Sequence, residues 1–247
     1  MADEQTAVRI GGVGIDRALA LDSARNYLSR RDRFAYPAYD AFASSGGPWR
    51  ISDADLVAPV LLNAEMNSRV FYALEALRPH MEDWLRHIPV DARLVEAGEP
   101  ELAQLGELFA VLDGGDIPLK ARGAILAKVM HRKRPSFVPL YDRFIDHCYR
   151  RAPQAPVPVD MRRTWRDFLP LLGAAITRDL RDSADFFDEV AALATEPLIT
   201  PLRALDIVAW YAGRTEVGAP IWRAGSPEAL AEDEGDEIWI DPDDERP

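Results

Sequence analysis

Apolar residues recur at helical spacing along much of this chain, and this pattern narrows the possible folds more than any other feature of the sequence. Between residues 56 and 77, a mainly apolar face that includes Asn63 and Asn67 repeats every three or four positions, as on one side of an α-helix. Further helices are predicted at residues 16–31, 81–88, 100–112, 119–132, 143–150, 161–178, 183–194 and 202–212. Strand patterns are scarce, with the apolar triplet at residues 238–240 as one short exception. We therefore predict an all-α fold.

Capping residues and prolines indicate where these helices begin and bend. Ser52 precedes Asp53 and Asp55, so it can cap a helix whose first turn carries the negative charge that the helix dipole favours. Pro59 follows within about one turn and can kink that helix.

The chain suits one globular domain between two weaker segments. Residues 1–14 are small, polar and glycine-containing, so we expect a flexible N-terminus. Residues 15–226 form the expected single globular helical domain, because a 48% hydrophobic fraction is enough for an ordinary core. Residues 228–247 hold ten acids and one arginine, a net charge of −9. Residues 227–247 are therefore expected to be a disordered acidic tail.

The sequence carries no sign of a membrane segment or of secretion. It has no run of 18 apolar residues, and its N-terminus lacks a basic stretch followed by an apolar one. The single cysteine, Cys148, fits a reducing compartment, so we expect a cytoplasmic protein. The four histidines show no metal-ligand spacing, so neither a metal nor another cofactor is expected.

One basic segment stands out in an otherwise acidic chain. The net charge is −12, but residues 117–151 hold nine Lys and Arg against two Asp, a net of +7. A local basic surface attracts nucleic acid even where the overall charge opposes it. DNA is therefore the expected partner. The predicted contacts to its phosphates are Lys120, Arg122, Lys128, His131, Lys133 and Arg134.

Two motifs carry a resemblance to a known family. The first, K-x-x-x-x-K-R-P-x-x-x-P-x-x-D, runs from Lys128 to Asp142, and the second, L-R-x-L-D-x-x-x-W, runs from Leu202 to Trp210. Over about residues 100–212 the chain resembles helix-hairpin-helix DNA glycosylases and, more closely, a family of uncharacterised bacterial proteins related to the 8-oxoguanine DNA glycosylase-like proteins. The resemblance implies a two-lobed helical domain with a cleft between the lobes. It also implies a catalytic aspartate at the start of a helix, here Asp142.

The match departs from the glycosylases at their hairpin. An ungapped alignment on Asp142 places the hairpin at residues 118–122, P-L-K-A-R, which lacks both hairpin glycines. Those glycines let backbone N–H groups approach a phosphate. The departure therefore argues against a standard phosphate-clamping hairpin.

Asp142 admits two interpretations. In a glycosylase, a carboxylate near the sugar stabilises the positive charge that develops there and can activate water, while the target base flips into a pocket. Alternatively, Asp142 only caps the helix that it opens, and the protein is a non-catalytic helical binding or partner-regulating module. The basic side chains could equally form a solvated face or pair with the acidic tail. Asp206 and Trp210 could belong to a satisfied core.

Overall fold

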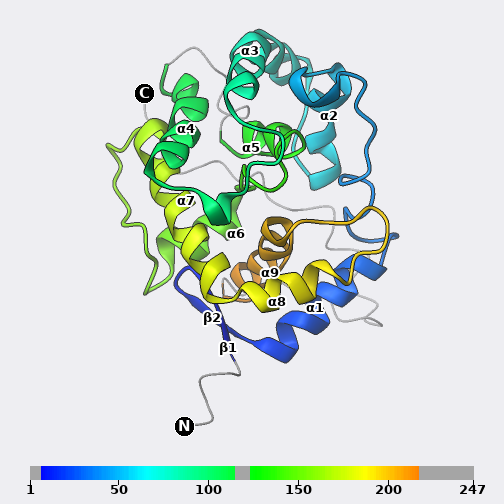
Figure 1. Ribbon diagram of the computed structural model, residues 1–247, viewed down its shortest axis with the longest axis vertical. Coiled ribbons are helices and arrows are strands. Elements are labelled where there is room, and N and C mark those ends of the chain that lie inside the picture. Colours follow the sequence, from blue (N-terminus) through cyan, green and yellow to red (C-terminus); the bar gives the residue numbers. More distant parts are fainter. Residues whose placement is uncertain (1–6, 115–122, 217–247) are drawn as a thin grey trace.

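The computed structural model describes residues 7–114 and 123–216, and most of these residues are helical (Figure 1). The prediction of a mainly helical protein is confirmed. The α-helices in these ranges are α1 (Arg17–Ser29), α2 (Asp53–Val57), α3 (Ser68–His87), α4 (Glu99–Phe109), α5 (Ala124–His131), α6 (Arg143–Asp146), α7 (Trp165–Asp182), α8 (Ala184–Ala191) and α9 (Pro201–Glu216). The predicted acidic tail and the basic residues Lys120 and Arg122 lie outside the described residues.

The N-terminal segment contains a hairpin, so the expectation of a flexible segment at residues 1–14 is wrong for residues 7–14. Strands β1 (Ala7–Ile10) and β2 (Val13–Asp16) pair antiparallel, and one face of the pair is buried. Gly11 makes the turn with a φ of 58°, and its amide donates to an Asp179 carboxylate oxygen of α7 at 2.6 Å. Alternation over only four residues per strand is too short a signal to stand out in the sequence.

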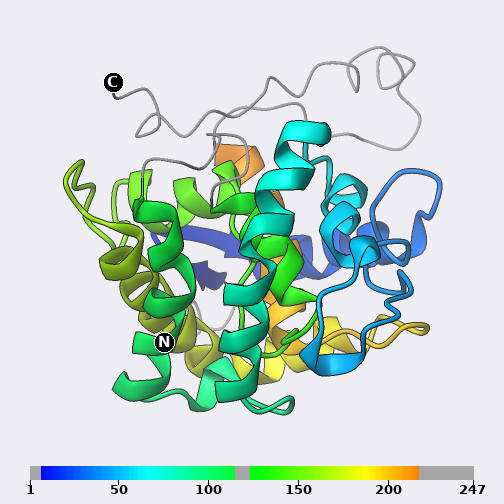
Figure 2. The same cartoon turned by 90° about the horizontal axis from the view of Figure 1, so that it is seen from above.

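The elements fall into two groups with α6 between them (Figure 1). The hairpin, α1, α8 and α9 pack on one another in the lower part of the view, and α2, α3, α4 and α5 occupy the upper part. Helix α7 packs along α4 and also contacts α8, α9 and β1. Seen from above, α3 and α4 lie next to each other (Figure 2). The two ends of the described chain therefore form one group and its middle forms the other.

The long helix expected after residue 52 is interrupted. Ser52 caps α2 as predicted, and its hydroxyl accepts a hydrogen bond from the Asp55 amide. Pro59 then lies in a 3-10 turn, Ala58–Leu62, which ends at Asn63 in the left-handed conformation, φ 56°. Asn67 starts α3 anew by accepting from the amide of Val70 at 3.0 Å. The separate helix predicted at residues 81–88 is the last part of α3.

Within the part of the chain that the structure describes, no helix combines the length and the apolar character that crossing a membrane requires. In the same residues, no group of three or more His, Cys, Asp or Glu side chains is arranged to hold a metal ion. Cys148 is buried as a free thiol.

Candidate functional site

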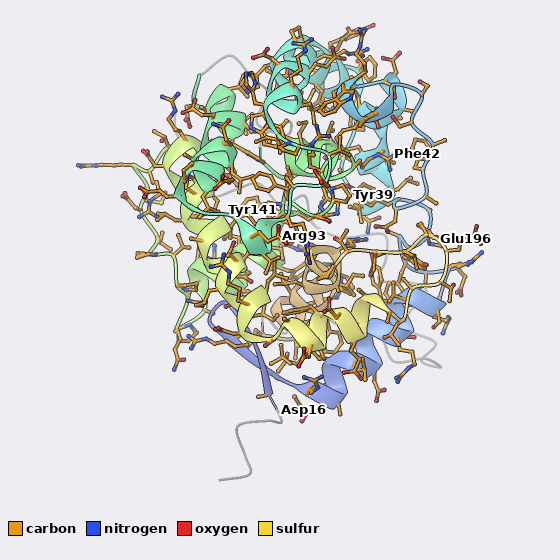
Figure 3. All side chains as sticks on the ribbon, in the orientation of Figure 1. Asp16, Tyr39, Phe42, Arg93, Tyr141 and Glu196 are labelled. Carbon is orange, nitrogen blue, oxygen red and sulfur yellow. The ribbon has the colours of Figure 1, made fainter. Side chains whose placement is uncertain are left out.

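A small cavity of about 70 Å³ lies where the two sequence motifs meet. Residues of α1 and α9 form one wall, and the 3-10 turn after α2, helix α5 and residues 140–142 form the other, so the cavity lies between the two groups of elements. The lining residues are Tyr27, Leu62, Lys128, Leu140, Tyr141, Asp142, Arg203, Asp206, Ile207 and Trp210. Of these, Tyr141 is labelled in Figure 3, near the middle of the molecule. A cavity of this size holds one or two water molecules.

Asp142 stands at the N-terminus of α6 and lines the cavity. Its Oδ1 accepts hydrogen bonds from the amides of Phe144 (2.9 Å) and Ile145 (3.0 Å), which caps the helix. Its Oδ2 has no hydrogen-bond partner in the described part of the chain, and it is not sealed from solvent. The capping role and a chemical role are therefore compatible, because they use different oxygens.

Asp206, on α9, brings a second carboxylate into the cavity. Its Oδ2 pairs with the guanidinium of Arg203, one turn earlier in the helix. The pKa of Asp206 is raised to about 6, mainly by burial; Arg203 opposes the shift, and the Asp142 carboxylate contributes to it. A carboxyl group that titrates this close to neutral pH can exchange a proton during a reaction.

Arg203 is buried and ties three segments together. Its Nε donates to Asp40 at 3.0 Å, and Nη2 donates to the hydroxyl of Tyr27 at 3.1 Å, while Nη1 holds Asp206. One positive charge therefore faces two carboxylates, those of Asp40 and Asp206. This arrangement fixes the Asp206 carboxyl group through its Oδ2.

Lys128 lines the cavity, and its ammonium group is bonded to another residue of the cavity wall. The Nζ donates to the carbonyl oxygen of Leu62 at 3.0 Å. Burial lowers the pKa of Lys128, and the carboxylates of Asp142 and Asp206 oppose that shift. Lys128 therefore neutralises part of the charge of the two acids.

The remaining basic residues of the first motif are held by partners inside the protein. Lys133 is buried, with its Nζ 2.8 Å from a carboxylate oxygen of Asp55 and 2.7 Å from the hydroxyl of Ser44. His131 is buried, and its Nδ1 lies 2.7 Å from the carbonyl oxygen of Val138. Burial lowers the pKa of His131 to about 4, so the ring is neutral at pH 7.

Arg134 is the most completely buried of these residues, and four carbonyl oxygens satisfy its guanidinium. The predicted contacts of Lys128, His131, Lys133 and Arg134 with DNA phosphates therefore need correction, because in this fold these side chains are buried and bind protein groups. Spacing could not reveal this, since a basic cluster has the same pattern whether it faces solvent or a buried loop.

An aromatic cluster adjoins the cavity, and we did not predict it from the sequence. The ring of Trp210 makes edge contacts with Tyr27 (6.1 Å), Phe34 (6.2 Å) and Phe144 (6.0 Å between centroids). Tyr27 and Phe34 stack at 4.8 Å. The signal lay in the second motif, where residues 203, 206 and 210 share one face of a helix.

The comparisons with known proteins give a family. Neither the curated proteins nor the solved structures provide a match to this chain. The family of unknown function DUF6308 matches residues 20–213, a span that includes every residue of the cavity wall. The chain therefore belongs to the family of unknown function DUF6308.

Proposed function

We propose that this protein is a DNA-binding, glycosylase-like enzyme that hydrolyses the bond between a base and its sugar. The observation that carries the proposal is the meeting of the two motifs in one cavity. Asp142 of the first motif and Asp206 and Trp210 of the second line it together, although 64 residues separate the two acids. Such a cluster of charged and aromatic side chains at a junction between groups of helices is typical of a ligand site.

Asp142 is suited to act on a cationic sugar. Breaking the glycosidic bond leaves positive charge on the sugar, which a fixed carboxylate in a water-poor site stabilises. The Oδ1 bonds to α6 hold Asp142 in place, and Oδ2 remains to face that charge or to accept a proton from the attacking water. The rings of Trp210 and Tyr27 offer surfaces against which a flipped base can stack.

The arrangement of the elements supports the same proposal. The ends of the described chain form one group, its middle forms the other, and Asp142 opens a helix between them. A two-lobed fold of the helix-hairpin-helix glycosylase kind has its site in the cleft between lobes. Lys120 and Arg122 remain the proposed phosphate contacts, since the other basic residues of the segment have internal partners.

A second candidate is a non-catalytic helical binding or partner-regulating module. The small volume of the cavity, about 70 Å³, favours it, because a nucleobase needs more space than one or two waters. In that case Asp142 only caps α6, and Lys128 only holds the turn at Leu62.

Asp142→Asn distinguishes the two candidates, because asparagine keeps an Oδ1 acceptor for the cap and loses the charge. In the enzyme, base release from duplexes carrying damaged bases falls by at least about 100-fold, while DNA affinity holds or tightens. Asp16→Asn is the matched control, since Asp16 caps α1 in the same way and lies outside the cavity. A wild-type protein that binds no DNA at low salt and releases no base supports the module.

A further inference from the structure

A base that leaves a sugar takes the electron pair of the broken bond with it. It therefore needs a proton unless it already carries a positive charge. We propose that Asp206 donates this proton and that Arg203 is the residue that positions it. This inference rests on the proposed function above, and it assigns separate roles to the two carboxylates of the cavity.

The geometry leaves one oxygen of Asp206 for this task. Arg203 holds Oδ2. Oδ1 has no hydrogen-bond partner in the described part of the chain and is not sealed from solvent, and the residue lines the cavity beside Trp210. A proton on Oδ1 can therefore be passed to a base held against Trp210 without breaking the pair with Arg203.

Charge balance in the cluster favours a bound proton. Three acids face two bases, so the fully ionised cluster carries one surplus negative charge in a largely buried place. The charged groups are Asp40, Asp142, Asp206, Lys128 and Arg203, and the Tyr27 hydroxyl completes the set. Asp40 accepts hydrogen bonds from Arg203 through both oxygens, and Asp142 accepts two from backbone amides. Asp206 is buried and, among the described residues, accepts only through Oδ2, so its ionised form is the least stabilised of the three, and a proton taken up by the cluster binds there. Its pKa, raised to about 6, agrees with this assignment.

Arg203 sets the direction of the carboxyl group. Its guanidinium is anchored from behind by both oxygens of Asp40, at 3.0 and 3.3 Å, and by the hydroxyl of Tyr27 at 3.1 Å. A planar guanidinium with this many partners holds a fixed orientation, so it holds the Asp206 carboxyl group as well.

The resulting reaction is balanced. The bond between the sugar carbon and the base nitrogen breaks, its electron pair stays on the base, and the proton of Asp206 Oδ1 joins the base. Water adds to the sugar carbon, and its proton passes to Asp142. One water is consumed, and the proton gained by Asp142 returns to Asp206 through solvent. Neither a metal nor a redox partner is required.

The experiment compares leaving groups that need a proton with one that does not. Release of uracil, hypoxanthine, 8-oxoguanine and the cationic base 7-methylguanine is measured from otherwise identical duplexes with wild-type protein, Asp206→Asn and Asp142→Asn. We expect Asp206→Asn to lower the release of a neutral base by at least about 100-fold and that of 7-methylguanine by less than about five-fold. Asp142→Asn should lower both, because both reactions pass through a cationic sugar.

A pH profile of the wild-type protein gives a readout that does not depend on the folding of a variant. With a donor pKa of about 6, kcat/KM for a neutral base falls about 50-fold between pH 6 and pH 8, and that for 7-methylguanine does not follow. Loss of activity in Asp142→Asn with full neutral-base release in Asp206→Asn overturns this inference and leaves the proposed function standing. A wild-type protein that releases only 7-methylguanine also overturns it, and one that releases no base overturns both.

Discussion

Arg134→Met tests whether this arginine serves the fold or the surface. Three of its bonds cross between segments: Nη2 donates to Leu85 at 2.7 Å, Nε to Ile88 at 2.9 Å and Nη1 to Pro48 at 2.9 Å. The first two acceptors lie at the end of α3, where the last carbonyl groups lack partners within the helix. Arg134 therefore caps α3 and ties the segment around residue 48 to it.

The expected loss of stability in Arg134→Met follows from these hydrogen bonds. A hydrogen bond from a charged donor contributes about 1.5–3 kcal/mol, and methionine leaves the buried acceptors of Leu85 and Ile88 unpaired and releases the exposed carbonyl of Pro48. We expect the free energy of unfolding to fall by about 4–6 kcal/mol. For a protein of this size that lowers Tm by about 10–20 °C. Such a loss is a large part of the total stability of about 5–15 kcal/mol that is typical of folded proteins.

The assay is thermal and urea unfolding, followed by circular dichroism, with DNA binding measured on the folded protein. Arg86→Met, on the helix α3 that Arg134 caps, is the matched control, because its side chain is 61% exposed and its ion pair within the described residues is with Asp83 alone. It should change stability by no more than about 0.5 kcal/mol. An Arg134→Met protein that melts within about 3 °C of wild type and binds DNA more weakly would refute the reasoning and return Arg134 to the surface.

Three further predictions follow from single features. Because burial lowers the pKa of His131 to about 4, its stabilisation is present above about pH 6.5 and is lost as the pH falls toward 4. Urea titrations should show His131→Asn gaining about 3 kcal/mol relative to wild type between pH 7 and pH 4, and a constant difference would disprove this. Gly213→Ala places a Cβ 2.6 Å from the carbonyl oxygen of Phe144 and should cost about 1–3 kcal/mol in urea unfolding, whereas Gly14→Ala, with no atom within 4 Å, should be nearly neutral. Deleting residues 228–247 removes a net charge of −9 and should tighten DNA binding in low-salt titrations; equal affinities would remove the idea of competition by this segment.

The helical character of this protein and the positions of several helix starts follow from its sequence. These are local properties: apolar spacing selects a helical face, and Ser52 and Asp142 each cap the helix that follows them. The two motifs also marked the segments that meet in the cavity, because charged and aromatic residues at fixed spacing on a helix must share a face.

Which charged side chains are buried depends on long-range packing. The partners of Lys133 and Arg134 include Ser44, Leu85 and Ile88, residues that lie tens of positions away in the sequence. Nothing in a local pattern reveals a distant carbonyl or carboxylate, so a buried capping arginine and a solvent-facing one have the same sequence signature.

The same physical reason applies to the cavity. Asp206 alone in a helical pattern is indistinguishable from a satisfied core residue. Its raised pKa and its place beside Asp142 arise because α9 packs against α6 and burial removes water from the carboxyl group. Long-range packing therefore turned two local motifs into one candidate site.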